Sequence, residues 1–457
     1  METHHHKRSA FSGKLGFVLS AAGASVGLGN IWRFPYLAAK YGGGIFLLIY
    51  IILAVTFGYT MIMAETALGR MTKKSPVGAF SAFGKGPGLS FGGWINAIIP
   101  ILIVPYYSVI GGWVIKYLVE YLRGGGSALA QDGYFSGFIS NGVSVELCFL
   151  AFTLFTLAII FAGVRNGVER VSKCMMPVLA VLSVIIAVYS VTRPGALAGV
   201  KYFLVPNLDN FSWMTVVSAM GQMFYSLSIA MGILITFGSY MKKNVSIEDS
   251  TTNVEIFDTA IAIMAGLMII PAVFAFSGGD PDTLQAGPAL MFITIPKVFD
   301  SMGMGTVVGV LFFVLVLFAA VTSSIALTES AVSTFEDELG WKRHKSTLLI
   351  GVIMVALGSL SALGYGPLGE VTVFGMQFLD LFDFLTNSVM MPIAAIAICL
   401  LVSRVIGVEK IEEEVTQEGG RFRRKAIFNF MIRYLCPLFA AIILVSSVAN
   451  ALGWIKM

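Results

Sequence analysis

The sequence predicts an all-α integral membrane protein with eleven transmembrane helices, from its composition, the length of its apolar segments and its charge distribution. Hydrophobic residues occupy 57% of the 457 positions and charged residues only 12%, whereas soluble proteins carry roughly 25% charged residues. Most of the apolar segments reach the roughly 20 residues that a helix needs to cross a bilayer. They lack the alternation over about ten residues that is typical of outer-membrane strands.

Eleven apolar segments follow one another along the chain. They cover residues 14–39, 44–69, 91–122, 144–163, 168–191, 213–240, 254–278, 305–335, 346–363, 371–403 and 428–453. The first is too long for a cleavable signal peptide, and no small-residue cleavage site with a polar sequence follows it. We therefore expect a single membrane domain over residues 1–457.

Lysine and arginine are divided unevenly between the two sides of these segments. If the N-terminus is cytoplasmic, the inner segments hold 21 of these charges. The outer loops and the C-terminus then hold far fewer, Arg123, Arg193, Lys201, Lys297 and Lys456 besides Lys40 at the end of the first segment. Positive loops stay inside, so we expect a multi-pass plasma-membrane protein with a cytoplasmic N-terminus and an extracellular C-terminus. Attraction to the anionic inner leaflet explains the net charge of +4 without a nucleic-acid partner.

The first apolar segment is interrupted. Gly23, Gly27 and Gly29 are followed by the polar amide of Asn30. Gly23 and Gly27 also form a small-xxx-small pair, so close helix packing is one interpretation. A helix that breaks inside the bilayer instead leaves backbone groups that need partners, and a bound ligand or ion can be that partner.

The sixth segment shows a similar interruption. The stretch "GQMFYSLSIAMGILITFGSY" places Ser226, Ser228, Ala230 and Gly232 between apolar runs. The first and sixth segments each lead a group of five. Paired interruptions at corresponding positions indicate a transporter with inverted repeats and a binding site near the bilayer midplane.

Four stretches carry a resemblance to a known family: "GLGNIWRFPYLAAKYGGG", "PYYSVIGGW", "GQMFYSLS" and "LFAAVTSSIALTES". In this order and spacing they resemble the signatures of the neurotransmitter:sodium symporter family, and most of all its short, eleven-helix bacterial amino-acid members. The resemblance implies the leucine-transporter fold. Two inverted five-helix repeats, helices 1–5 over residues 14–191 and helices 6–10 over 213–403, then have broken helices 1 and 6, and helix 11 lies at 428–453.

The resemblance also implies a sodium-coupled symporter with two sodium sites, and sodium prefers oxygen ligands as other hard cations do. The site called sodium 2 takes the carbonyls of Gly23, Val26 and Ala319 with the hydroxyls of Thr322 and Ser323. The site called sodium 1 takes the carbonyl of Ser25, the side chain of Asn30, Ser226 and Asp258, and the substrate carboxylate completes it. The alternative for the two hydroxyls of sodium 2 is that they bond back to their own helix.

Asp258 departs from the best-known bacterial members, which resemble this chain but carry asparagine there and an acid at the position of Ala262. An acid in an apolar helix is costly unless it has partners. A protonated, hydrogen-bonded acid is the alternative interpretation. As a carboxylate, Asp258 would provide the negative charge that chloride provides in animal relatives, so we expect no chloride requirement.

The substrate expected from the resemblance is a hydrophobic L-amino acid, aromatic or branched. Amine-carrying members have an acid where this chain has Gly27, and the half-helix N-termini at the break suit a carboxylate. Met231 is an adaptable side chain where relatives often carry Phe. The implied binding residues are Ser25, Gly27, Gly29, Ile103, Tyr107, Tyr225, Ser226, Ser228, Met231, Ser323 and Leu327. A carrier of amines or indole derivatives is the alternative.

Two pairs of charged residues resemble the family's gates. Arg33 and Asp383 resemble the outer pair, with Asp380 close enough to leave the aspartate open, and Arg8 and Asp337 resemble the inner pair. An ion channel would need a continuous polar pore, whereas the polar residues here converge at one depth. No catalytic triad, metal cluster or nucleotide motif occurs, so we expect a transporter and not an enzyme.

Overall fold

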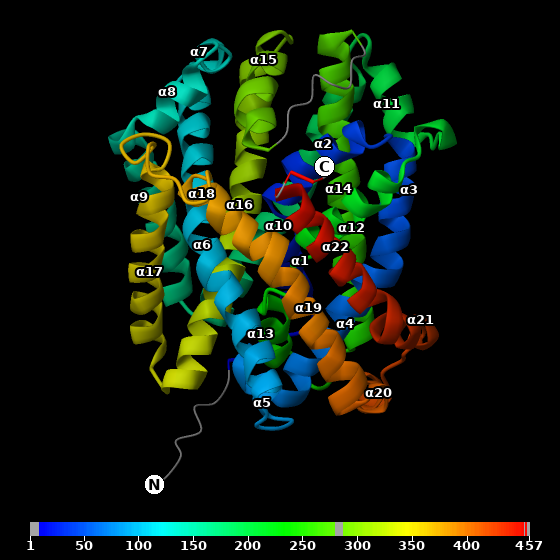
Figure 1. The fold of residues 1–457 in the computed structure, drawn as a ribbon. Coiled ribbons are helices and arrows are strands. Elements are labelled where there is room, and N and C mark those ends of the chain that lie inside the picture. Colours follow the sequence, from blue (N-terminus) through cyan, green and yellow to red (C-terminus); the bar gives the residue numbers. More distant parts are fainter. Residues whose placement is uncertain (1–8, 279–286, 452, 455–457) are drawn as a thin grey trace.

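The structure is a computed structural model that describes residues 9–278, 287–451 and 453–454. The described chain forms a bundle of long helices that run between two ends of the molecule (Figure 1). Its only strand-like feature within these ranges is one isolated bridge between Val373 and Met376. The predicted all-α membrane fold is confirmed.

Nine helical runs among the described residues are long and apolar enough to span a membrane. The runs built of one helix, or of a short π-helical turn (η) and one helix, are α6 (Pro87–Leu122), α9 (Gly142–Phe161), η3 (Val164–Glu169) with α10 (Arg170–Val191), α14 (Ile247–Ser277), α16 (Gly305–Leu339) and α17 (Arg343–Leu363). The composite runs are α3 (Gly44–Leu53), η2 (Ala54–Gly58) and α4 (Tyr59–Thr72); α18 (Phe378–Asp383), η7 (Phe384–Met390), α19 (Met391–Leu400) and η8 (Leu401–Ile406); and α21 (Lys425–Phe430), η10 (Met431–Leu435) and α22 (Cys436–Ala451).

The first and sixth spans are broken, as the sequence predicts. The first consists of α1 (Lys14–Ser25), η1 (Gly29–Arg33) and α2 (Phe34–Lys40), and its halves are bent by 55°. The sixth consists of α12 (Trp213–Ser226) and α13 (Ile233–Tyr240), with a non-helical linker between them. The first broken pair raises the number of apolar spans among the described residues to ten, and α12 with α13 covers the sixth predicted segment.

Short helices connect the spans. They are α5 (Pro76–Ser81), α7 (Gly126–Leu129), α8 (Tyr134–Ser140), α11 (Ala196–Leu204), the π-helical turn η6 (Leu290–Thr294), α15 (Ile295–Asp300), α20 (Val408–Thr416) and the 3-10 turns η4 (Leu208–Asn210) and η9 (Gln417–Gly419). The predicted boundary at residue 371 is wrong, because the tenth span begins at Phe378. A tight turn precedes it, with the left-handed residues Phe374 (φ 53°) and Gly375 (φ 76°), and this turn ends any helical continuation.

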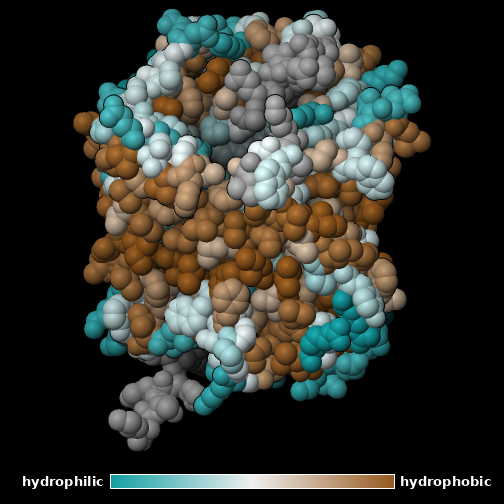
Figure 2. All heavy atoms as spheres, in the orientation of Figure 1, coloured by the Kyte–Doolittle hydropathy of each residue, from teal (hydrophilic) through white to brown (hydrophobic). Residues whose placement is uncertain are grey.

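The surface agrees with a membrane-embedded bundle. A hydrophobic belt surrounds the middle of the visible face, and hydrophilic residues gather at both ends (Figure 2). Large apolar side chains on the outer spans are exposed, among them Leu154, Val181 and Val352. Polar residues such as Asn30, Glu65 and Asp258 are fully buried instead. The bundle is therefore apolar toward lipid and polar around its centre.

Small residues let α4 and α13 pack closely. A Cβ atom on Gly69 would lie 1.9 Å from the Ile235 carbonyl oxygen, and one on Gly238 would lie 2.4 Å from the Thr66 carbonyl oxygen. Both obstacles are backbone atoms, so a larger residue could fit only if a helix moved. Close approach through small residues is the usual way in which membrane helices gain packing energy, and it holds α13 against α4.

We predict that Gly69→Ala lowers the melting temperature of the purified protein in detergent by several degrees, because forced overpacking costs about 1–3 kcal/mol. The matched control is Gly88→Ala, since a Cβ at Gly88 meets nothing within 4 Å. Gly88→Ala should leave the melting temperature unchanged or raise it slightly. Equal melting temperatures for the two variants would contradict the close packing of α4 and α13.

Candidate functional site

The break in the first span exposes a short piece of backbone. α1 ends at Ser25, and Val26 adopts an extended conformation (φ −73°, ψ 96°) before the chain resumes as the π-helical turn η1. The Val26 N–H still donates to the Ala22 carbonyl (2.7 Å), and the Asn30 N–H donates to the Gly27 carbonyl (3.2 Å). The carbonyls between these two points no longer have helical partners, so other groups must satisfy them.

The break in the sixth span is made by left-handed residues. Ser228 (φ 52°), Ala230 (φ 58°) and Gly232 (φ 71°) lie in the linker between α12 and α13. Non-glycine residues rarely adopt this conformation without support from their surroundings. Glu65 gives that support, since its Oε1 atom accepts the Ala230 N–H at 2.7 Å. This buried acid therefore stabilises the shape of the linker.

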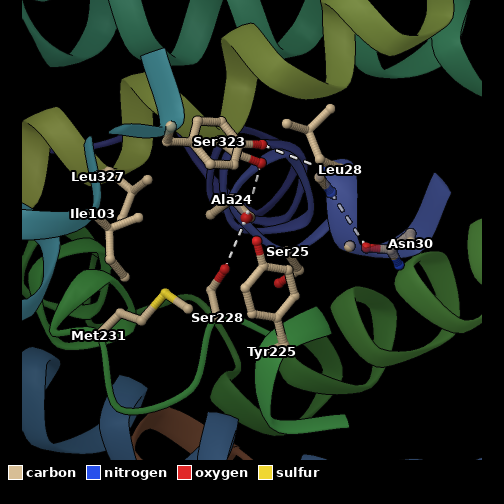
Figure 3. Close-up of a pocket in the computed structure, with 13 residues that line it drawn as sticks. Ala24, Ser25, Leu28, Asn30, Ile103, Tyr225, Ser228, Met231, Ser323 and Leu327 are labelled. Carbon is tan, nitrogen blue, oxygen red and sulfur yellow. Dashed lines mark hydrogen bonds between the residues drawn. The ribbon is translucent and has the colours of Figure 1, made fainter. Parts of the chain in front are cut away.

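A small cavity of about 30 Å³ lies where the two breaks meet. Its lining consists of Ala24, Ser25, Gly27, Leu28, Gly29, Asn30, Ile103, Tyr107, Tyr225, Ser228, Met231, Ser323 and Leu327. Ile103, Met231 and Leu327 form an apolar side opposite the backbone of the broken helix (Figure 3). A water molecule needs about 10–15 Å³, so the cavity has room for roughly two, and anything larger requires its walls to move.

The lining agrees closely with the residues that the sequence singled out for a substrate. Every one of them lines the cavity except Ser226, whose hydroxyl turns toward Asp258 instead. The structure adds Ala24, Leu28 and Asn30 to the lining. Ala24 and Leu28 flank the predicted glycines and have no polar side chain, so only their position beside the break could have identified them.

The glycines at the first break make room for neighbouring side chains. A Cβ on Gly27 would lie 2.8 Å from Ser323 Oγ and 3.1 Å from the Tyr107 hydroxyl oxygen. A Cβ on Gly29 would lie 2.4 Å from the Tyr225 ring. Gly29 therefore admits an aromatic ring to the broken helix, and Gly27 brings the backbone against two hydroxyl groups.

The residues predicted for sodium 2 gather around Ser323. The Ser323 hydroxyl faces three carbonyl oxygens of α1 and its break, those of Gly23 (3.1 Å), Ala24 (3.2 Å) and Val26 (3.3 Å). Thr322 behaves differently: its hydroxyl donates back along α16 to the carbonyls of Phe318 (2.9 Å) and Ala319 (3.2 Å). The alternative interpretation, a bond back to the same helix, thus describes Thr322, whereas Ser323 reaches across to the first span.

Thr322 and Ala319 nevertheless lie on the same helix close to Ser323 and to the broken first span. A Cβ on Gly23 would lie 3.0 Å from Thr322 Cβ, so the two backbones are in close contact there. The Ala319 carbonyl accepts from Thr322. Carbonyl and hydroxyl oxygens concentrated in this way, without a cationic side chain among them, match the ligand preference of a hard cation.

The residues predicted for sodium 1 surround Asp258. This carboxylate accepts from Asn30 Nδ2 (2.9 Å) and from the Ser226 hydroxyl (3.1 Å). It also accepts from the Tyr50 hydroxyl (3.4 Å), which donates to Ser226 as well (3.1 Å). Sequence reasoning missed Tyr50, because nothing in an apolar second span shows which tyrosine faces the broken helices.

Asp258 has only neutral hydrogen-bond donors in these contacts. It is fully buried, and none of the ion pairs found between described residues includes it. A buried carboxylate gains from a cation that shares its ligands. The Ser25 hydroxyl points to the carbonyls of Ala21 (3.1 Å) and Leu227 (3.3 Å), and the predicted ligand from this residue is its own carbonyl.

A larger vestibule of about 530 Å³ lies on one side of the central cavity. Tyr225 belongs to the lining of both, and Arg33, Asp380 and Asp383 face the vestibule. The predicted outer pair therefore shares one space, and Asp380 shares it too. Among the described ion pairs within 4.0 Å, none joins Arg33 to Asp383, so the two charged side chains line the same vestibule without a direct contact.

The opposite end is closed by packed side chains. Phe11 stacks edge-on against Phe17, Phe237 and Tyr240, and its N–H donates to the Tyr240 carbonyl (3.1 Å). Asp337 accepts the Ser75 N–H at 2.6 Å. Arg8, its predicted partner, lies outside the described residues.

A partly buried ion pair at this end was not predicted. Arg343 contacts Glu329 at 2.5 Å, and the Tyr240 hydroxyl donates to the same carboxylate at 2.7 Å. The contact joins α13, α16 and α17. The sequence shows an acid in the eighth span and an arginine at the start of the ninth, but not that they meet.

Comparisons with known proteins agree with this architecture. The chain is 34% identical to the sodium-dependent transporter YhdH of Bacillus subtilis, over 95% of this chain and 96% of that protein. It is 31% identical to a sodium-dependent transporter of Haemophilus influenzae, over 98% and 100% of the two chains. These relatives are transporters, so the expectation of a transporter and not an enzyme is confirmed.

A solved structure shares the fold as well. The crystal structure of MhsT in complex with L-phenylalanine superposes with a TM-score of 0.86 at 34% identity, and the match covers 96% of this chain and 100% of that one. The sequence profile described as "Sodium:neurotransmitter symporter family" matches residues 8–125 and 136–454. The chain therefore belongs to the sodium:neurotransmitter symporter family.

Proposed function

We propose that this protein imports hydrophobic L-amino acids, aromatic or branched, by sodium-coupled symport. The observation that carries the proposal is the position of the central cavity. It lies between the carbonyl cluster around Ser323 and the carboxylate cluster around Asp258, at the meeting point of the two broken helices. One space thus touches both candidate cation sites, and a substrate there can interact with both.

An amino acid fits this cavity better than an amine. Gly27 faces the hydroxyls of Ser323 and Tyr107 with no acid at that position to hold an ammonium group. The Tyr107 hydroxyl lies 3.4 Å from the Leu28 N–H, so a substrate carboxylate can accept hydrogen bonds from both donors beside the break. MhsT, which is similar to this chain, has been solved with L-phenylalanine.

The apolar side of the cavity supports a hydrophobic side chain. Ile103, Met231 and Leu327 are all nearly fully buried. Because the cavity is smaller than an amino acid, the substrate must displace part of this wall. The unbranched thioether of Met231 can change rotamer at little cost, which suits substrates of several shapes.

Coupling follows if the substrate carboxylate completes the shell of the cation at sodium 1. Each ligand then raises the affinity of the other by the same factor. The buried charge of Asp258 already neutralises one cation at this site, so we propose that chloride is not required. With two sodium ions per zwitterion, the membrane potential adds about 2.3 kcal/mol per charge for every 100 mV.

The charge distribution and the gate pairs support an orientation in the membrane and a mode of movement. The bias of lysine and arginine supports a cytoplasmic N-terminus, and the open vestibule then faces outward. The repeats are residues 14–191 and 213–403, with the helix at 428–453 outside them. Arg33 with Asp383 forms the outer gate, and Arg8 with Asp337 the inner gate. Closing one before opening the other gives alternating access.

A binding panel tests the substrate class. We predict that purified protein binds L-phenylalanine, L-tryptophan or L-leucine in sodium and not in potassium, with equal affinity in chloride and gluconate. Tryptamine should not compete, because it lacks the carboxylate. Competition by tryptamine alone would favour the amine or indole-derivative carrier, and sodium-independent ion currents without solute uptake would favour a channel.

A pair of adjacent serines tests sodium 2. We predict that Ser323→Ala weakens sodium affinity about tenfold, the factor that corresponds to about 1.4 kcal/mol, because an oxygen ligand is lost. Ser324→Ala is the matched control, since its hydroxyl lies against Thr156 at 3.3 Å, away from the carbonyl cluster. Sodium titrations of substrate binding measure both. Equal affinities for the two variants would remove Ser323 from the site.

The role of Asp258 is tested by removing its charge. We predict that Asp258→Asn lowers sodium affinity at least about tenfold, because a buried anion no longer offsets the cation. Asp132→Asn is the control, since Asp132 is an exposed loop acid that contacts Lys297. If Asp258→Asn kept the sodium affinity of the parent in chloride-free buffer, the carboxylate could not be the replacement for chloride.

A further inference from the structure

The carboxylate of Asp383 is held by two neutral donors. Asn387 Nδ2 donates to its Oδ1 atom at 2.6 Å, and the Tyr106 hydroxyl donates to the same atom at 3.2 Å. The donors also contact each other, since Asn387 Nδ2 lies 3.2 Å from the Tyr106 hydroxyl. The Thr386 hydroxyl belongs to the same hydrogen-bonded cluster and lies 3.3 Å from the Tyr106 hydroxyl. Tyr106 and Thr386 are fully buried.

Arg33 contacts an aromatic ring and not a carboxylate. Its guanidinium lies over the ring of Tyr225, 5.1 Å from the ring centroid, a distance at which a cation is attracted to the face of an aromatic ring. Arg33 and Asp383 both line the open vestibule. Each of the two charges is thus stabilised separately while the vestibule is open, although an ion pair between them is the obvious alternative.

We propose that Asn387 and Tyr106 are positioning residues of the outer gate, which hold Asp383 away from Arg33 and so set how readily the gate closes. The proposal rests on the gate role of Arg33 and Asp383 given under the proposed function. Closure is then an exchange of partners, in which Asp383 gives up hydrogen bonds from neutral donors and gains the guanidinium.

The direction of the effect follows from this exchange. A donor that acts only in the open state stabilises that state, so removing it shifts the population toward the closed state. A hydrogen bond to a charged group is strong enough to shift such an equilibrium about tenfold. If the donors stayed on Asp383 through closure, their removal would leave the equilibrium unchanged or weaken the closed state.

The vestibule can be probed directly with a thiol reagent. A cysteine introduced as Val217→Cys, at a residue that lines the vestibule, is placed in a background in which Cys148 and Cys174 are replaced by alanine. Its rate of modification by a charged methanethiosulfonate reagent in sodium, without substrate, reports the open population. We expect Asn387→Ala and Tyr106→Phe each to lower this rate, from about twofold if the parent is mostly open to about tenfold if it is mostly closed, because the rate follows the open fraction.

A double-mutant cycle tests whether the two donors act by competing with Arg33. Because the donors compete with Arg33, Asn387→Ala should have no effect on the labelling rate in an Arg33→Ala background. Ser388→Ala, one residue further along η7, is the matched control and should label like the parent. Melting temperatures in detergent separate a misfolded variant from a shifted equilibrium, and Tyr106→Phe keeps the ring if Asn387→Ala fails to fold.

Two results would overturn the proposal: labelling that is unchanged or faster in both donor variants, or an equal decrease in the presence and absence of Arg33. Substrate binding provides a second readout, since a shift toward the closed state should raise the apparent affinity for L-phenylalanine in Asn387→Ala. If the parent bound no amino acid in sodium, the proposed function would fail, and the labelling cycle would still test the donors.

Discussion

The structure depends on how it satisfies backbone groups that two interrupted helices expose within a membrane-spanning bundle. No water or lipid headgroup is at hand there, so every free carbonyl or N–H needs a protein or ligand partner. Ser323 faces three carbonyls of the first break, Ser228 donates to the Ala24 carbonyl at 2.8 Å, and Glu65 accepts an N–H of the second break. These partners hold the two irregular segments side by side and leave a small cavity between them.

The same arrangement explains why polar residues concentrate at one depth. A hydroxyl that reaches across to a broken helix can be replaced by a cation that binds the same oxygens, which makes the carbonyl cluster a candidate sodium site. Asp258 adds a fully buried carboxyl group on the other side of the cavity, with Tyr50 and Ser226 as neutral partners. The atoms that stabilise the broken helices are therefore the same atoms that we propose as cation ligands.

The two ends of the molecule differ in how their charges are partnered. At the vestibule end, Arg33 lies over an aromatic ring and Asp383 accepts from neutral donors. At the opposite end, the buried carboxylate of Glu329 pairs with Arg343 and Tyr240, and Phe11 packs into the aromatic cluster. A charge held by neutral partners can exchange them at modest cost, whereas breaking a buried ion pair leaves an uncompensated charge. This difference fits an end that is open and an end that is shut.

Much of this protein was determined by its sequence alone. The spans, the two breaks and nearly all residues around the central cavity could be predicted, because hydropathy, glycine spacing and family motifs are properties of short stretches. Only the tertiary structure decided which partner each polar group takes. It assigned Tyr50 to Asp258, Asn387 to Asp383 and Arg343 to Glu329, and it separated Ser323, which reaches across to the first span, from Thr322, which bonds back to its own helix. Such choices depend on the distance and rotation of helices that lie far apart in the chain, and no local pattern contains that information.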